Sequence, residues 1–273
     1  MVVVLCLSMM HGGRYVHRSI DFPQTVSGQK FSLTGADVCP THSPVTGKPL
    51  VIDRIVMVCQ FTGSVAVTAV AGEDVPRCAQ RVELTQVDKV VRVNALDGDQ
   101  LRLAAIEQAG MLETREHAGW AVGALSATEV QIPINLTTPL AFAPDDTALM
   151  PAAIESLKWQ GVTTGTTGPC VAGGTLTFTS ANWYLLVECR EVDYIVNGPV
   201  AAWQVWDMRD QANYRIPLDG AIPAAVLIHR RCHTTGGGSL TTASITEIAL
   251  PRRSSLSAYP IGWRLIFTPL FAS

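Results

Sequence analysis

Leu50–Val58 (LVIDRIVMV) and Trp183–Val192 (WYLLVECREV) are the stretches that decide the fold. Each is rich in β-branched, aromatic and other apolar residues over a length typical of a buried strand. Similar runs recur along the chain, and Gly, Pro, Asn or Asp interrupts them repeatedly. Residues of these types mark turns between strands. The sequence therefore predicts an all-β protein, a sandwich of short strands joined by long connections.

The remaining elements are predicted from the same signals. Two short helices are expected, at Gly98–Gly110, where Leu101, Ala104 and Ala105 follow helical spacing, and at Ala148–Leu157, which follows the acidic pair Asp145–Asp146. The expected strands are Lys30–Thr34, Leu50–Phe61, Ser64–Val70, Arg81–Thr85, Lys89–Val93, Glu129–Leu136, Leu157–Thr163, Thr175–Thr179, Trp183–Val192, Ala202–Asp207, Tyr214–Leu218, Ala224–His229, Ser244–Leu250 and Gly262–Thr268.

Composition excludes several classes of protein. The 273 residues are 48% hydrophobic and only 16% charged, which excludes disorder for most of the chain. The net charge of −3 provides no sequence-wide basic field, so we expect no sequence-specific or genome-coating contact with nucleic acid. A surface so poor in charge is typical of a protein covered by neighbouring subunits. We therefore expect an assembly.

The apolar start, Met1–Met10, is not basic enough at its beginning for a signal peptide, and no segment of the chain is long and apolar enough to span a bilayer. We expect it to be a buried or interface strand within an N-terminal arm. The seven cysteines are odd in number and never spaced as Cys-x-x-Cys, which favours free thiols in a reducing cytoplasm.

Between residues 90 and 192, the order of features resembles the upright jelly-roll major capsid proteins of the PRD1–adenovirus lineage. Val91–Leu103 (VRVNALDGDQLRL) leads a strand into a short helix through a Gly-Asp turn. Ile132–Ala153 (IPINLTTPLAFAPDDTALMPAA) is similar to the stretch that links two strands of their roll. Leu157–Thr163 and Trp183–Val192 are similar to their closing strands.

This resemblance implies a jelly-roll β-sandwich of the viral capsid kind with a second, smaller β region, and a double jelly roll is the close alternative. The domains expected are an N-terminal arm at 1–19, a jelly roll at 20–195, and a second β region or partial second roll at 196–273. The function implied is that of a major capsid protein in an icosahedral bacteriophage virion. Its partners would be its own copies, as homotrimers or pseudo-hexagonal capsomers, other capsid proteins, and in some relatives an inner membrane; it would be made in the host cytoplasm.

Two other functions are weighed against this one. A β-sandwich binding module, such as a phage spike, a fibre or a carbohydrate-binding domain, would need Trp203, Trp206 and Tyr214 exposed together. A cupin-like enzyme would need histidines and a carboxylate converging on a metal, and the six histidines lack such spacing.

No catalytic, cofactor-binding or metal-binding residue is predicted, and the protein is not expected to be an enzyme. His229, Cys232 and His233 lack a second ligand pair for zinc. Lys48 follows Gly47 as in a P-loop, but the first glycine of that motif is missing. The other residues considered were assigned ordinary structural or surface roles: Asp97, Asp99, Asp145, Asp146, Asn135–Thr137, Arg230–Arg231, Arg252–Arg253 and, as core or contact anchors, Trp159, Trp183, Trp203, Trp206 and Trp263.

Overall fold

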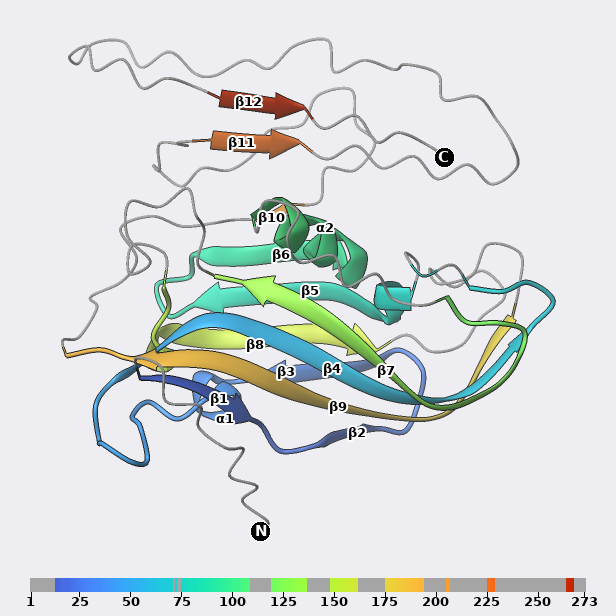
Figure 1. Cartoon of the computed structure of the whole chain (residues 1–273), viewed down its shortest axis with the longest axis horizontal. Coiled ribbons are helices and arrows are strands. Elements are labelled where there is room, and N and C mark those ends of the chain that lie inside the picture. The colour runs from blue at the N-terminus through green and yellow to red at the C-terminus, as the bar shows by residue number, and fades with distance from the viewer. Residues whose placement is uncertain are drawn as a thin grey trace. The chain divides into compact units, whose positions relative to one another are not determined.

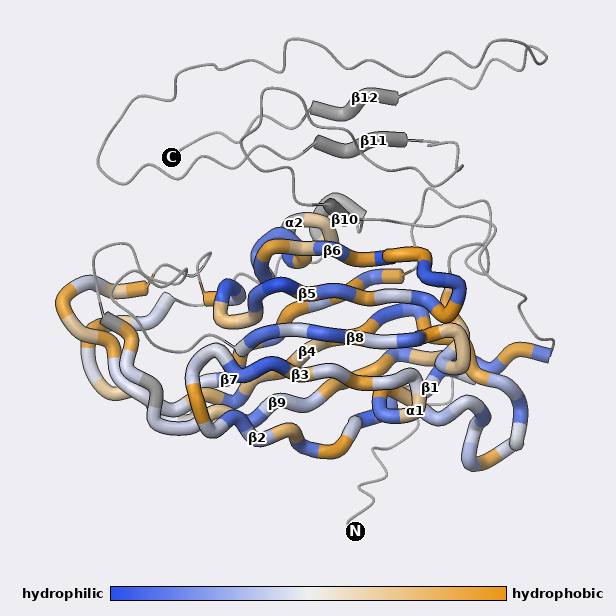
Figure 2. Tube along the Cα trace, turned by 180° about the vertical axis from the view of Figure 1, so that it is seen from behind, coloured by the Kyte–Doolittle hydropathy of each residue, from blue (hydrophilic) through white to orange (hydrophobic). Residues whose placement is uncertain are grey.

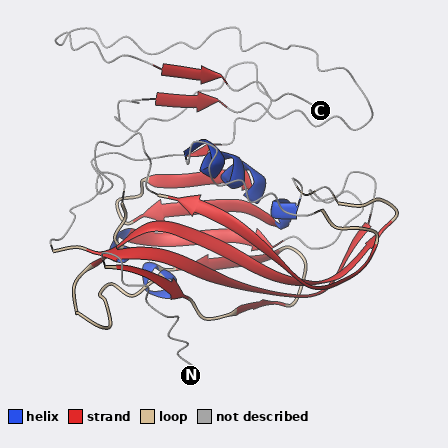
Figure 3. Ribbon diagram, in the orientation of Figure 1, coloured by secondary structure: helices blue, strands red, loops and turns tan. Residues whose placement is uncertain are grey.

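The chain divides into two compact units, Met1–Tyr214 and Arg215–Ser273. The computed structural model describes residues 13–70, 72, 75–108, 119–136, 148–161 and 175–193, and the short strands at 205–206, 225–228 and 264–267. Strands dominate these residues (Figure 3). The second unit contributes β11 (Ala225–Ile228) and β12 (Arg264–Phe267), which pair in parallel. The predicted domain boundaries remain predictions.

One sheet of the first unit, sheet A, has the order β1-β9-β4-β7, with β2 also paired to β9. Every pair in it is antiparallel. Its long strands β4, β7 and β9 curve together in Figure 1. The bounds of its strands are β1 (Arg14–Arg18), β2 (Phe22–Gln24), β4 (Leu50–Ala66), β7 (Gly123–Asn135) and β9 (Thr175–Glu191).

The facing sheet, sheet B, has the order β10-β6-β5-β8-β3. Its pairs are antiparallel except for β10, which lies parallel to β6. The bounds of its strands are β3 (Gln29–Leu33), β5 (Ala79–Gln86), β6 (Val91–Asp97), β8 (Ile154–Gly161) and β10 (Val205–Trp206).

This strand order is that of a jelly roll. With β1 and β2 taken as one interrupted strand, sheet A holds the first, eighth, third and sixth strands, and sheet B holds the second, seventh, fourth and fifth. From β2 to β9, every connection crosses between the sheets except the one from β5 to β6. Two sheets wound in this way define the jelly-roll sandwich. The predicted all-β jelly-roll class is confirmed.

Aromatic side chains fill the space between the sheets. Phe31 stacks on Trp159 with their ring centroids 4.7 Å apart, and Trp183 lies 5.8 Å from Trp159. Phe61 stacks on Trp120 at 5.3 Å. Trp159 and Trp183 are therefore the core anchors that the sequence predicts, whereas Trp120 is a core residue that it did not single out.

Glycine at position 63 explains why β4 is one strand and not the two predicted at 50–61 and 64–70. A Cβ on Gly63 would lie 2.1 Å from the backbone oxygen of Thr177 on β9, so only glycine fits there. The register shifts beside it on both neighbouring strands. The glycine marks a β-bulge, not a turn. The runs predicted at 175–179 and 183–192 are likewise one strand, β9.

The predicted helix near residue 98 is confirmed as α2 (Gly98–Gln108), whereas the helix predicted at 148–157 is wrong. There, a single 3-10 turn, η3 (Pro151–Ala153), leads directly into β8. Pairing with β3 and β5 outweighs the helix propensity of this stretch. Two short helical elements were not predicted, α1 (Gly35–Val38) and the 3-10 turn η1 (Val75–Cys78).

The first strands also differ from the prediction. Residues 14–18, expected in the N-terminal arm, form β1 and pair with β9. The strand predicted at 89–93 begins later, at Val91, because residues 86–90 form a turn in which Lys89 has a φ of 68°. The N–H of Lys89 donates to the carbonyl of Gln86 in this turn.

In the described part of the chain, no helix is long and apolar enough to cross a membrane.

Candidate assembly surface

The outer face of sheet B is polar. Lys158 of β8 pairs in register with Glu83 of β5 and with Ser32 of β3. On each of these strands, the residues immediately before and after are buried in the core. These three side chains therefore point outward. Lys158 Nζ lies 3.2 Å from Glu83 Oε1 in an ion pair. Figure 2 shows hydrophilic and hydrophobic residues alternating along the strands of this sheet.

The outer face of sheet A is different, because it carries a hydrophobic cluster of its own. Val56 and Val58 of β4 and Tyr184 of β9 are buried there, with Leu186 partly buried against them, separately from the main core. We call these four residues the outer cluster. Val58 is fully buried although it lies on the outside of the sandwich. The outer face of sheet A thus combines this apolar cluster with the ion pair of Arg54 and Glu188, and sheet B combines its own ion pair with Leu96, which is 41% exposed.

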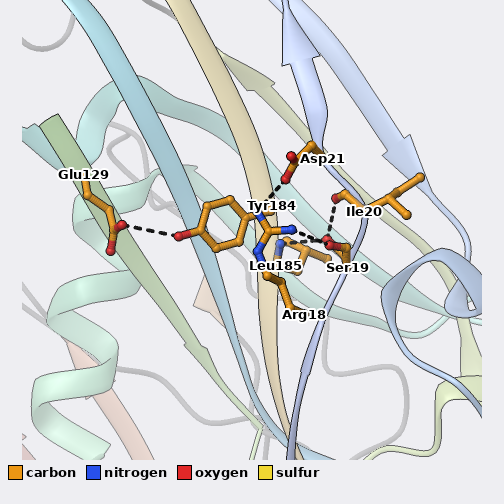
Figure 4. Close-up of polar contacts among 7 residues, drawn as sticks. All are labelled: Arg18, Ser19, Ile20, Asp21, Glu129, Tyr184 and Leu185. Atoms are coloured by element: carbon orange, nitrogen blue, oxygen red, sulfur yellow. Dashed lines mark hydrogen bonds and ion pairs between the residues drawn. The ribbon is translucent and has the colours of Figure 1, made fainter. Parts of the chain in front are cut away.

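Arg18, Tyr184 and Glu129 form a chain of polar contacts across this face of sheet A, which we call the strap (Figure 4). The hydroxyl of Tyr184 donates to Glu129 Oε2 of β7 at 3.3 Å, so the ring spans β4, where Val58 is its partner in register. The guanidinium of Arg18 stacks on the ring, 4.1 Å from its centroid. Burial, followed by the charge and hydrogen bond of Glu129, raises the pKa of Tyr184 above its usual value. The phenol therefore stays a neutral donor.

The strap also fixes the turn that follows β1. Arg18 donates to Asp21 Oδ1 at 2.6 Å and to the carbonyl of Ser19 at 3.2 Å. The backbone N–H of Leu185 in β9 donates to Ser19 Oγ at 2.9 Å. These contacts join β1, the turn after it and β9.

Beside the strap, apolar side chains remain exposed along the edge of sheet A. Val16 of β1 is 52% exposed and Ile20 is 71% exposed. β1 is an edge strand in the described part of the chain, because its pairing is with β9. An edge strand with exposed apolar side chains is a site at which another chain can pair or pack. We call Val16 and Ile20 the apolar edge.

Further exposed apolar residues lie at both ends of the roll. Val45 and Val87 belong to the connections from β3 to β4 and from β5 to β6, at the same end. Val26, Val67 and Val122 belong to connections at the opposite end. Exposed valines at the two ends and on one edge place apolar surface on several sides of the roll.

The two acidic residues beside α2 are structural. Asp97 Oδ1 accepts hydrogen bonds from the backbone N–H groups of Asp99 and Gln100, both at 3.1 Å, and so caps the helix. Its Oδ2 lies 3.3 Å from Arg77 Nε in a buried ion pair. Asp99 pairs with Arg102 at 2.8 Å.

The other described residues considered in the sequence also have ordinary partners. Lys48 lies 2.7 Å from Asp193 in an exposed ion pair, and Gly47 before it has a φ of 73° in a turn. Asn135 is the last residue of β7 and pairs in register with Arg54. Within the described residues, no group of three or more His, Cys, Asp or Glu side chains could hold a metal ion.

Several residues weighed in the sequence lie outside the described residues, so nothing is said of their surroundings. These are Asp145, Asp146, Trp203, Tyr214, His229, Arg230, Arg231, Cys232, His233, Arg252, Arg253 and Trp263, together with the side chain of Trp206.

His17 of β1 is expected to couple the attachment of this strand to pH. It pairs in register with the buried Val187, so its ring points toward the core, and burial lowers its pKa from the usual value near 6.5. The folded state therefore favours the neutral ring, and the unfolded chain binds the proton more readily. Stability is expected to fall as the pH drops below about 6.5. Thermal unfolding between pH 8 and pH 5 should show a smaller loss for His17→Gln than for the wild type.

The exposed His42 provides the control for this prediction. His42→Gln should leave the pH dependence of the melting temperature as it is in the wild type. Equal pH profiles for the wild type and His17→Gln would show that this ring does not couple protonation to folding.

Comparison with known proteins gives similarity in structure alone. No family model matches the chain, and no curated protein matches it. Among solved structures it is similar to the STIV MCP, with a TM-score of 0.36 and 12% identity over 65% of this chain and 48% of that one. It is similar to the major capsid protein P2 from bacteriophage PM2, with a TM-score of 0.30 and 13% identity over 68% of this chain and 47% of that one.

PBCV-1 VP54, fitted into a reconstruction of the virophage Sputnik, is similar with a TM-score of 0.34 and 11% identity over 70% of this chain and 46% of that one. The chain therefore spans about half the length of these structures. The STIV and PM2 structures are major capsid proteins, the kind of protein that the sequence resembles. The jelly-roll assignment itself rests on the strand order of this chain.

Proposed function

We propose that the protein is a structural virion protein, a major capsid protein whose copies assemble into trimeric or pseudo-hexagonal capsomers of an icosahedral shell. Its partners are its own copies and other capsid proteins, and its location is the virion, after synthesis in the host cytoplasm. The proposal assigns no catalytic residue.

The observation that carries the proposal is the apolar edge, where Val16 on the edge strand β1 and Ile20 in the turn after it are exposed. The space between the sheets is filled by Phe31, Trp159 and Trp183, which leaves the outer surfaces as the part of the roll that can act. Only 16% of the residues are charged, so the chain has few charged side chains with which to keep its outer surfaces in water. Contact with another copy of the chain removes the apolar part of these surfaces from water.

The packing physics supports sheet A as the contact face. Removing the exposed parts of two apolar side chains from water on each copy is favourable in proportion to the area buried. The strap of Arg18, Tyr184 and Glu129 keeps its polar groups paired within one copy, so they lose few hydrogen bonds when a neighbour covers them. Both outer faces carry an ion pair, Arg54 with Glu188 on sheet A and Lys158 with Glu83 on sheet B, so the choice of sheet A rests on its apolar edge.

A double variant of the apolar edge tests this proposal. Val16→Asp with Ile20→Asp should leave the far-UV circular dichroism unchanged, because both side chains are exposed, and should abolish assembly by placing charges in the contact. Light scattering and electron microscopy measure the outcome. The matched control is Ser32→Asp with Asn94→Asp, which adds the same two charges at exposed positions on the outer face of sheet B. Assembly of the double variant to the same mass as the wild type would contradict a contact at this edge.

A further inference from the structure

Two buried thiols from distant parts of the chain lie in contact. Cys39 is the residue that ends α1, and Cys189 lies on β9, 150 positions further along. Their Sγ atoms are 3.5 Å apart, and the side chains are 0% and 2% exposed. We propose that this pair is a redox site, at which Cys39 and Cys189 form a disulfide when the folded protein meets a low-molecular-weight disulfide. The inference does not depend on the proposed function.

The geometry requires little movement. A disulfide bond is about 2.05 Å long, so the two sulfur atoms need to approach by about 1.5 Å, which side-chain rotation can supply. Cys189 Sγ also lies 3.3 Å from the carbonyl oxygen of Val187. This contact holds the Cys189 thiol beside its partner.

Access to the pair comes through the connection that follows Cys39. Residues 40–48 are exposed except for the buried Ser43, so this segment has few apolar contacts to hold it closed. Segments of this kind open locally at a much lower cost than the sheets do. The segment is tied to the end of β9 by exposed polar contacts, Thr46 with Glu191 and Lys48 with Asp193, and we infer that its opening gives access to Cys39, the residue before it, without breaking the pairing of β4 with β9.

A second thiol pair provides an internal comparison. Cys59 hydrogen-bonds to Cys78, and both are buried. Cys59 lies in the middle of β4, which is paired with β7 on one side and β9 on the other. Its partner Cys78 lies in η1, where Val75 and Pro76 are buried and which packs against α2 and β7, so reaching this pair requires loss of buried apolar contacts and should be far slower than reaching Cys39.

The chemistry is thiol–disulfide exchange in two steps. The hydrogen bond with Cys189, followed by burial, raises the pKa of the Cys39 thiol far above its usual value, so the closed pair is neutral and unreactive. In the opened state, Cys39 loses its proton and its thiolate attacks one sulfur of oxidised glutathione, releasing a glutathione thiolate. Cys189 then attacks the sulfur of Cys39 in the mixed disulfide and releases the second glutathione. The two protein thiols lose two electrons and two protons, which convert one oxidised glutathione into two reduced molecules.

The bond would tie the connection between β3 and β4 to the central strand β9 and close a loop of 150 positions. In the chain-entropy account, a disulfide stabilises by restricting the unfolded chain, and more so for long loops. We expect the melting temperature to rise by roughly 10 °C on oxidation and to return on reduction.

The test is incubation of the full chain with oxidised glutathione, followed by alkylation of free thiols and non-reducing peptide mapping by mass spectrometry. The expected result is a peptide in which Cys39 is linked to Cys189 while Cys59 and Cys78 are still alkylated as free thiols. The melting temperature should rise, and dithiothreitol should reverse the rise. In Cys189→Ala, oxidation should leave Cys39 as a free thiol or a glutathione adduct and give no rise.

The wild-type map decides the question even if the variant does not fold. The folded and the urea-unfolded chain are incubated with oxidised glutathione for the same time. If Cys39 and Cys189 are still free in the folded chain when the unfolded chain has fully reacted, the proposal is overturned. If the disulfide between Cys59 and Cys78 forms before the one between Cys39 and Cys189, the proposed role of the opening at residues 40–48 is overturned.

Discussion

Trp183→Ala is expected to lower the free energy of unfolding by about 4 kcal/mol, the cost typical of deleting a buried tryptophan side chain. Trp183 is fully buried and packs beside the stacked pair of Phe31 and Trp159 in the interior of the roll. Its indole N–H donates to Gln24 Oε1 at 2.7 Å, a contact that links β9 to β2. The substitution removes both the packing and this link. Urea denaturation followed by circular dichroism measures the loss.

Two conservative variants separate packing from hydrogen bonding. Trp183→Phe and Trp159→Phe remove similar volumes from the same cluster, but within the described residues the indole N–H of Trp159 has no hydrogen-bond partner. Trp183→Phe should therefore cost about 1 kcal/mol more than Trp159→Phe. Equal costs for the two would show that the hydrogen bond to Gln24 contributes nothing to stability.

Asp97→Ala should lower the free energy of unfolding by about 3 kcal/mol, because it removes one partner of a buried ion pair together with a helix cap. The Asp97 side chain is 5% exposed and that of Arg77 is 12% exposed. Without Asp97, the N–H groups of Asp99 and Gln100 lose their acceptor and Arg77 loses a buried counter-charge. Thermal or urea unfolding gives the measurement.

Two controls belong with this variant. Asp97→Asn keeps an oxygen that can accept the two backbone hydrogen bonds and loses only the charge, so it should cost less than Asp97→Ala. Asp21→Ala breaks the exposed ion pair with Arg18 and should cost about 0.5 kcal/mol. A loss of the same size for Asp97→Ala and Asp21→Ala would contradict the structural role of the buried pair.

The elements that the sequence predicts well are those whose signal is local. The apolar run at 50–61 lies within β4, and the run at 183–192 ends one residue beyond β9. The helical spacing after Gly98 correctly predicts α2. The errors arise where tertiary pairing outweighs local preference. The Ala-rich stretch at 148–157 favours a helix by composition, but its second half is a strand because β3 and β5 pair with it.

The candidate surface could not be predicted, because it depends on contacts between distant residues. Arg18 meets the ring of Tyr184, and Tyr184 meets Glu129, only once β1, β7 and β9 are aligned in one sheet. No spacing in the sequence distinguishes Val58, which is buried on the outside, from the core residue Met57 beside it. β1 was missed because charged residues at both of its ends resemble an exposed arm more than a strand.

The mass of the purified wild-type protein in solution, measured by light scattering with electron microscopy of the same sample across ionic strength, tests the central claim most directly. Stable trimers or larger closed particles are expected, held by apolar contacts and therefore retained as salt is raised. A monomer under every condition would contradict the capsid proposal.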